Sequence, residues 1–309
     1  MLSKFSYKGG KISNRLVGYS GMRNMTTIVL DGVDECLQYK VFPLLFSECL
    51  QLEDVAFKNC RIMTCVHIIN AKLRCLNMID CGYMDILPSF IHIDAPNLSS
   101  FEYVGHTTKI FFVKAPRLLK VFWNAAKRDK NPYPFGPIAR LHDIENLAMI
   151  INASQITELS AILVRFQNLR QLELFIEGAY DLNMDYFWIL DIAMASPHLQ
   201  KLSVTIRHSD MENSHMVGFK RQRREYAKFS HNDLKYVCGC VCTINAIELA
   251  SQILKNANSL QQITFTPRDK FYIGAGEWTE SSDGCWFEQN LIHEMLKDNV
   301  NEQCRLIIL

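Results

Sequence analysis

A short apolar phrase, Leu-x-x-Leu-x-Leu with other apolar residues often in place of Leu, recurs along this chain of 309 residues. Clear copies begin at seven leucines, which are Leu52, Leu73, Leu98, Leu118, Leu169, Leu199 and Leu260. Weaker copies begin at Leu2, Met25 and Ile144, and a partial copy begins at Leu234. Most intervals fall in the range of about 20–29 residues that is typical of leucine-rich repeats. Such a stack presents an extended surface, which favours binding over catalysis in a single pocket.

The apolar positions of each copy predict one strand per repeat. The fourth and sixth positions alternate with polar residues, as in a strand that buries one face. In the copy at Leu52, we expect Val55 and Phe57 to point inward and Asp54, Ala56 and Lys58 to point outward. We therefore predict an α/β fold, a leucine-rich-repeat solenoid (horseshoe) with a parallel concave sheet.

The connectors between the strands predict a convex side that changes from irregular to helical. From Leu52 to Leu118 they are short, and proline follows Ala95 and Ala115 just before new repeats, which disfavours helix there. Residues 156–166 and 244–254 instead carry apolar residues at helical spacing. We predict a repeat array over residues 1–230, with exposed loops near 127–137 and 207–230, followed by C-terminal repeats and a cap over 231–309.

Composition restricts the function further. Lysine and arginine number 33 against 32 acidic residues, a balance that argues against a dedicated nucleic-acid-binding protein. The basic run at 220–224 indicates a solvated charged loop, with a nuclear-localisation signal as the alternative. The sequence shows no signal peptide and no apolar run long enough to span a membrane, so we predict no membrane partner and a cytoplasmic or nuclear location.

The cysteines and motifs predict no catalytic, cofactor-binding or metal site. Cys60 and Cys81 occupy the Asn/Cys position of the repeat consensus and are expected to be structural. Cys238, Cys240 and Cys242 are interpreted as strand thiols, with metal binding as the weaker alternative because a second ligand pair is missing. No nucleophile, metal-protease or phosphate-binding signature is present, and we predict that the chain is not an enzyme.

The outward strand positions are the candidate partner-binding residues. Phe122 and Phe175 would be aromatic anchors if they are displayed on the concave face, and core residues if neighbouring side chains cover them. The full candidate set is Asp54, Lys58, Asn77, Glu102, Phe122, Asn124, Glu173, Phe175, Ser203 and Thr205.

Three segments resemble plant F-box/leucine-rich-repeat proteins of the FBD type. They are IDAPNLSSFEYVG at 93–105, the start of the chain at 2–9, and the FBD-like stretch that begins with HNDLKYV at 231–237 and continues to residue 268. The resemblance implies that the chain binds an unidentified protein target as the substrate-binding part of an SCF ubiquitin-ligase receptor. No F-box precedes the first repeat in this sequence, so we expect the SCF adaptor as a partner only if an F-box is supplied. The alternative is a non-ligase interaction scaffold or decoy.

Overall fold

The fold comes from a computed structural model that divides into two compact units. Unit 1 comprises 1–129 with 274–277, and unit 2 comprises 130–273 with 278–309. The residues whose structure is described are 3–10, 23–33, 41–61, 65–82, 90–105, 110–124, 138, 141, 143–153, 166–178, 186–208, 226, 228–239, 244–266, 269–274, 277–281 and 289–309.

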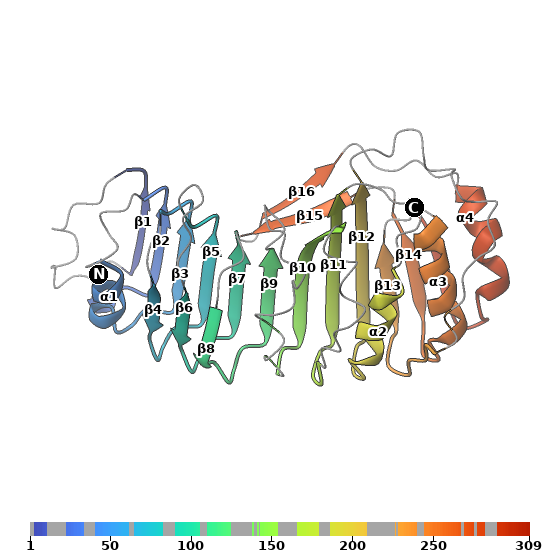
Figure 1. The fold of residues 1–309 in the computed structure, drawn as a ribbon, viewed down its shortest axis with the longest axis horizontal. Helices are drawn as coiled ribbons and strands as arrows, with labels where there is room; N and C mark the ends of the chain where they lie inside the picture. Colours follow the sequence, from blue (N-terminus) through green and yellow to red (C-terminus); the bar gives the residue numbers. More distant parts are fainter. Residues whose placement is uncertain are drawn as a thin grey trace. The chain divides into compact units, whose positions relative to one another are not determined.

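Unit 1 contains a parallel main sheet built from the predicted repeat strands (Figure 1). Its strands, in spatial order, are β1 (Lys4–Lys8), β2 (Thr27–Asp31), β3 (Asp54–Lys58), β5 (Cys75–Ile79), β7 (Ser100–Val104) and β9 (Lys120–Asn124). Equivalent repeat positions lie side by side, so Leu76 pairs with Val55 on one side and Phe101 on the other. All three side chains are buried, and the inward rows build a continuous apolar core.

The residue after each of the first five main strands of unit 1, β1, β2, β3, β5 and β7, has a positive φ. At two of these positions the residue is not glycine, because Asn59 has φ 51° and Asp80 has φ 49°. Asn and Asp tolerate this conformation better than other residues with a side chain. The Asn59 amide donates to the carbonyl of Ile79, and the Asp80 amide donates to that of Val104. The turn therefore continues the hydrogen-bond ladder one residue beyond the strand.

The connectors between the repeats of unit 1, which were predicted to be irregular, form a second parallel sheet. It consists of β4 (Val66–Ile69), β6 (Ile91–Asp94) and β8 (Ile110–Lys114), and a helix, α1 (Val41–Glu48), precedes β3. The prediction was wrong because each connector alternates apolar residues over a few positions, which is enough for a strand once neighbouring repeats supply partners. Val66, Ile68, Ile91 and Ile93 point inward and are buried.

A tight turn precedes several of the repeats, and it is closed in two ways. In five repeats the first leucine donates its amide to the carbonyl three residues earlier, as Leu52 does to Cys49 and Leu199 to Ser196. In two repeats a buried side chain replaces that carbonyl. Asn70 Oδ1 accepts the amide of Leu73 (3.1 Å), and His231 Nδ1 accepts the amide of Leu234 (3.0 Å).

Unit 2 continues the same repeat architecture with longer strands and more helices. Its main strands, in spatial order, are β10 (Asn146–Asn152), β11 (Gln171–Gly178), β12 (Lys201–His208), β13 (Tyr236–Gly239), β14 (Gln262–Phe265) and β17 (Arg305–Ile308). The helical elements are α2 (Trp188–Met194), α3 (Ile244–Asn256), α4 (Gln289–Leu296) and η5 (Lys297–Asn299), and a separate two-stranded sheet pairs β15 (Asp269–Gly274) with β16 (Glu277–Ser281).

Helix α3 confirms the predicted helical connector at 244–254. Ile247, Ile253 and Leu254 are buried, as the apolar spacing predicted. The polar face of α3 is buried as well, because α4 and η5 lie against it and Asn299 Nδ2 donates to Ser251 Oγ at 2.9 Å. The other predicted helix, at 156–166, lies outside the described residues except for Phe166, which is buried.

These observations confirm the predicted leucine-rich-repeat solenoid with parallel strands. The predicted boundary at residue 230 falls inside unit 2, where β12 and β13 pair in parallel. The predicted loop at 127–137 lies outside the described residues, as does most of 207–230. At the edges of that second segment, Arg207 and His208 belong to β12, and Phe229 is buried.

Among the described helices, none is long and apolar enough to cross a membrane.

Candidate functional site

The outer face of each main sheet, formed by the side chains that point away from the core, holds all of the predicted partner-binding residues. In unit 1 the strand register makes Asn77, Glu102 and Phe122 consecutive members of one row. Lys58 belongs to the next row, which ends at Asn124, and the two are separated by Ile79 and Val104. Asp54 lies in a third row beside Cys75.

Part of the outer face of unit 1 is covered. Asp54, Lys58 and Asn77 are half-buried, whereas Glu102, Phe122 and Asn124 are buried. Phe122 has only 5% of its surface exposed. Of the two alternatives for this position, a displayed anchor or a covered side chain, the structure shows the covered one. Strand alternation alone could not decide between them, because it gives the face of the sheet that a side chain lies on and not how far its neighbours shield it.

In unit 2 the predicted residues form two adjacent pairs on β11 and β12. Glu173 lies beside Ser203, and Phe175 lies beside Thr205. Glu173, Ser203 and Thr205 are half-buried, and the Glu173 carboxylate accepts a hydrogen bond from Gln171 Nε2 at 2.5 Å. Phe175 is 4% exposed, so it too is covered rather than displayed. It sits between Ile150, which is also buried, and Thr205.

A neighbouring row in unit 2 was missed by the sequence analysis. Its members, in register across five strands, are Gln171, Lys201, Tyr236, Gln262 and Arg305. Lys201, Tyr236 and Arg305 are exposed, and the Tyr236 hydroxyl donates to Gln261 Oε1 at 2.8 Å. Tyr and Arg are enriched among residues that dominate protein interfaces. Four of these residues share a sequence position that could have identified the row. Each stands two positions after the first leucine of its copy, which is Leu169, Leu199, Leu234 or Leu260.

The electrostatics of the outer face depend on local pairs. Asp31 accepts a hydrogen bond from Asn59 Nδ2 at 2.9 Å and lies 3.5 Å from the Lys8 ammonium. That hydrogen bond, together with the positive charges of Lys8 and Lys58, holds the pKa of Asp31 below its ordinary value. Burial and the neighbouring Asp54 carboxylate raise the pKa of the Cys75 thiol to about 11. Cys75 is therefore protonated at neutral pH and is a poor nucleophile.

Cys60 and Cys81 have the structural role that the sequence analysis predicted. The Cys60 thiol lies 3.4 Å from the carbonyl of Leu30, and the Cys81 thiol lies 3.3 Å from that of Phe57. Each bond joins one repeat to the preceding one. Each thiol can donate a hydrogen bond to the carbonyl that it faces. Burial, with a hydrogen bond to Cys60, holds the pKa of Cys81 well above its ordinary value.

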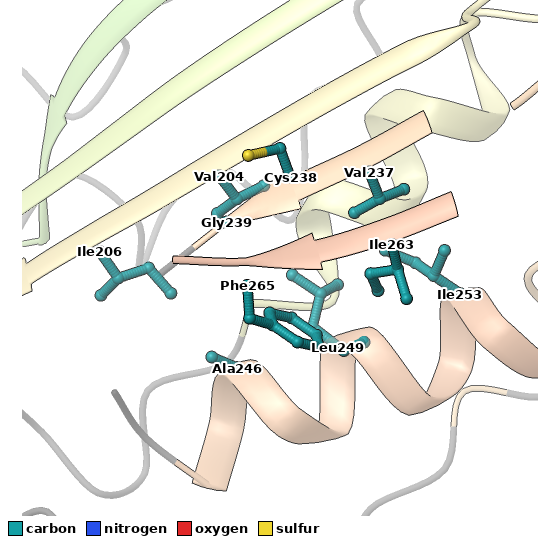
Figure 2. Close-up of a pocket in the computed structure, with 11 residues that line it drawn as sticks. Val204, Ile206, Val237, Cys238, Gly239, Ala246, Leu249, Ile253, Ile263 and Phe265 are labelled. Carbon is teal, nitrogen blue, oxygen red and sulfur yellow. The ribbon is translucent and has the colours of Figure 1, made fainter. Parts of the chain in front are cut away.

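A small apolar cavity lies between strands β12–β14 and helix α3 (Figure 2). It arises where Gly239 takes an inward position without a side chain, and Val204, Leu249 and Phe265 contribute to its walls. Its volume of about 30 Å³ corresponds to the share of one water molecule in the liquid. Its lining residues include no titratable group other than Cys238, so this cavity does not support acid–base catalysis.

Among the described residues, no group of three or more His, Cys, Asp or Glu side chains could hold a metal ion. Cys238 is half-buried on the outer face of β13, whereas Cys240 and Cys242 lie outside the described residues. The absence of enzymatic activity stays a prediction, as does the absence of a nucleic-acid partner.

Comparison with known proteins agrees with this architecture. The family model described as "At1g61320/AtMIF1, LRR domain" matches residues 16–300, which is most of the chain. No curated protein matches the chain. Leucine-rich-repeat domains are characteristic of protein–protein interaction, because their stacked strands form an extended binding surface.

Proposed function

This chain belongs to the At1g61320/AtMIF1 leucine-rich-repeat family, and we propose that it recognises a protein target through the outer face of its strands. Most concretely, it would be the substrate-binding part of an F-box-type SCF ubiquitin-ligase receptor. The FBD-like sequence at 231–268 supports this finer role by resemblance.

The row from Gln171 to Arg305 carries the proposal. It combines two exposed cations, an exposed tyrosine and two amides in strict register on adjacent strands. The adjoining row adds Glu173, Ser203 and Thr264, which are half-buried and can donate or accept hydrogen bonds. A polar surface with an aromatic residue near its centre is the pattern expected of a specific, non-obligate protein interface.

In this function the chain catalyses no step. It holds the target while a separately supplied F-box module recruits the ligase. Ubiquitin transfer is then promoted by the effective concentration of the target near the ligase, without any reacting group from the repeats. A scaffold or decoy that binds a target without ligase coupling is the alternative, because the recognised part of this sequence consists of repeats.

Affinity capture from plant extract tests the proposal and separates the two alternatives. The tagged chain is compared with Ser203→Arg, which places a long cation in the middle of the outer face. Ser259→Arg is the matched control, because Ser259 is an exposed residue in the turn before Leu260 and belongs to none of the outer-face rows.

A ligase receptor predicts recovery of the SCF adaptor and cullin together with a target whose yield falls for Ser203→Arg and not for Ser259→Arg. Recovery of that target without the adaptor would support the scaffold. Equal recovery of every protein with both variants would refute recognition through the outer face.

A further inference from the structure

The second sheet of unit 1 exposes a cluster of large apolar side chains. Leu50 is 61% exposed, Ile69 63%, Phe111 41% and Val113 56%. Ile69 lies on β4, Phe111 and Val113 lie on β8, and Leu50 follows α1, which packs against β4. We call this set, together with His67 and His92 between them, the second-sheet face. Contiguous exposed apolar surface is uncommon on soluble proteins and usually marks an interaction site.

Ring contacts make the second-sheet face continuous across its three strands. His67 pairs with His92 in the β4–β6 register, and His92 pairs with Phe111 in the β6–β8 register. The ring centroids are 5.1 Å apart in the first pair and 5.0 Å in the second, and both pairs are edge-to-face. The rings therefore form one packed row rather than separate exposed side chains.

One end of the second-sheet face is hollowed. The hollow has a volume of about 550 Å³ and is lined by Phe46, Leu50, His67, Ile69 and Lys72, with Ser47, Asn70 and Ala71 completing it. Pockets of this size accommodate several side chains of a ligand. Its apolar walls and single lysine suit an apolar side chain that has a negative charge beside it.

Two lysines flank the second-sheet face, and one carboxylate, that of Asp94, lies in the strand register between Ile69 and Lys114. Lys72 at the hollow hydrogen-bonds to the neutral amide oxygen of Gln51, so its charge is not offset by that partner. At the other end Lys114 is 69% exposed and lies 4.0 Å from Asp94, the limit of an ion pair. A partner that covers the apolar residues between these lysines gains from carrying carboxylates at its edges.

We propose that the second-sheet face docks an amphipathic segment of a partner protein, with apolar side chains on one side and carboxylates beside them. This surface is separate from the outer face of the main sheet. It therefore provides a second binding site whose failure would leave the proposed target recognition untouched.

Fluorescence anisotropy with short synthetic peptides tests this inference. The probe is a fluorescein-labelled amphipathic peptide of Leu and Glu, and the comparison peptides carry Lys in place of Glu or Ser in place of Leu. We expect saturable binding of the Leu/Glu peptide alone. The double variant Ile69→Ser/Val113→Ser and the double variant Lys72→Glu/Lys114→Glu should each weaken binding at least about tenfold.

The control variant is Leu309→Ser, because Leu309 is 62% exposed but belongs to unit 2. It should bind the Leu/Glu peptide as the wild type does. Circular dichroism must show that all variants remain folded, which is expected because the replaced side chains are exposed.

Three results would overturn the proposal. The first is equal binding of the Leu/Glu and Leu/Lys peptides, and the second is no binding of the Leu/Glu peptide. The third is a self-associating chain that becomes monomeric in the Ile69→Ser/Val113→Ser variant, which would assign the second-sheet face to a second copy of the chain.

Discussion

Removing the His231 side chain should destabilise the chain by about 2–4 kcal/mol. His231 is buried, and its Nδ1 accepts the amides of Asp233 (3.2 Å) and Leu234 (3.0 Å). Its Nε2 lies 3.1 Å from the carbonyl of Ser196 and donates to it, which leaves Nδ1 free to accept. Each hydrogen bond contributes about 0.5–1.5 kcal/mol, and a buried amide left without a partner costs more.

The chain contains an internal control for this prediction. In unit 1, Asn70 makes equivalent contacts. Its Oδ1 accepts the amides of Lys72 (2.8 Å) and Leu73 (3.1 Å), and its Nδ2 donates to the carbonyl of Cys49 (3.3 Å). The acceptor atom is bonded to Cγ in both residues. We therefore expect His231→Asn to retain most of the stability that His231→Ala loses, with a cost of about 1 kcal/mol for the smaller side chain.

Urea denaturation of wild type, His231→Ala, His231→Asn and His231→Leu measures these differences. His231→Leu retains apolar bulk without the acceptor and should resemble His231→Ala more than His231→Asn. Equal losses for Asn and Ala would show that ring packing, and not closure of the turn, determines the role of His231.

Four further predictions concern single positions. Gly239→Ala should destabilise the chain by about 1–3 kcal/mol in urea denaturation despite the adjacent cavity, because the added Cβ would lie 2.7 Å from the backbone oxygen of Val204; an unchanged midpoint would refute that clash. Phe122→Ala and Phe175→Ala should each cost about 3 kcal/mol and lower the melting temperature, since both side chains are buried; unchanged melting with reduced partner binding would restore them as surface anchors. Asp54→Asn should lower the pKa of Cys75 from about 11 and speed its alkylation by iodoacetamide at pH 8.5, as followed by peptide mapping; an unchanged rate would mean that burial alone sets that pKa. Asp31 has a lowered folded-state pKa, so its stabilising contribution is present above the unfolded value of about 3.9 and is lost as pH falls through the folded value; the difference in melting temperature between wild type and Asp31→Asn should shrink below about pH 4, and a difference constant with pH would contradict this.

The repeat strands could be predicted from sequence because their apolar spacing encodes both the strand and its buried face. Leu52, Val55 and Phe57 occupy the first, fourth and sixth positions of their copy, and all are buried. The second sheet was missed because β4, β6 and β8 have four or five residues each and are stable only beside one another. In hindsight, the alternation in VHII, IHID and IFFV indicated them.

The candidate site was predicted less completely than the fold. Period-two alternation placed Glu173 and Ser203 on the outer face, and the register places them side by side. The same rule could not show that Phe122 and Phe175 are covered, because alternation gives the face of a side chain and not its exposed fraction. Tyr236 was missed because only a partial copy begins at Leu234, and its importance follows from the register with Lys201 and Gln262.

The affinity of a purified target, recovered with the chain, for outer-face variants tests the central claim most directly. Isothermal titration would compare wild type with Tyr236→Ala, Ser203→Arg and the control Ser259→Arg. Recognition through the outer face predicts that Tyr236→Ala and Ser203→Arg each weaken binding by about tenfold or more and that Ser259→Arg leaves it unchanged. Unchanged affinity for both outer-face variants, with the fold intact, would contradict the account.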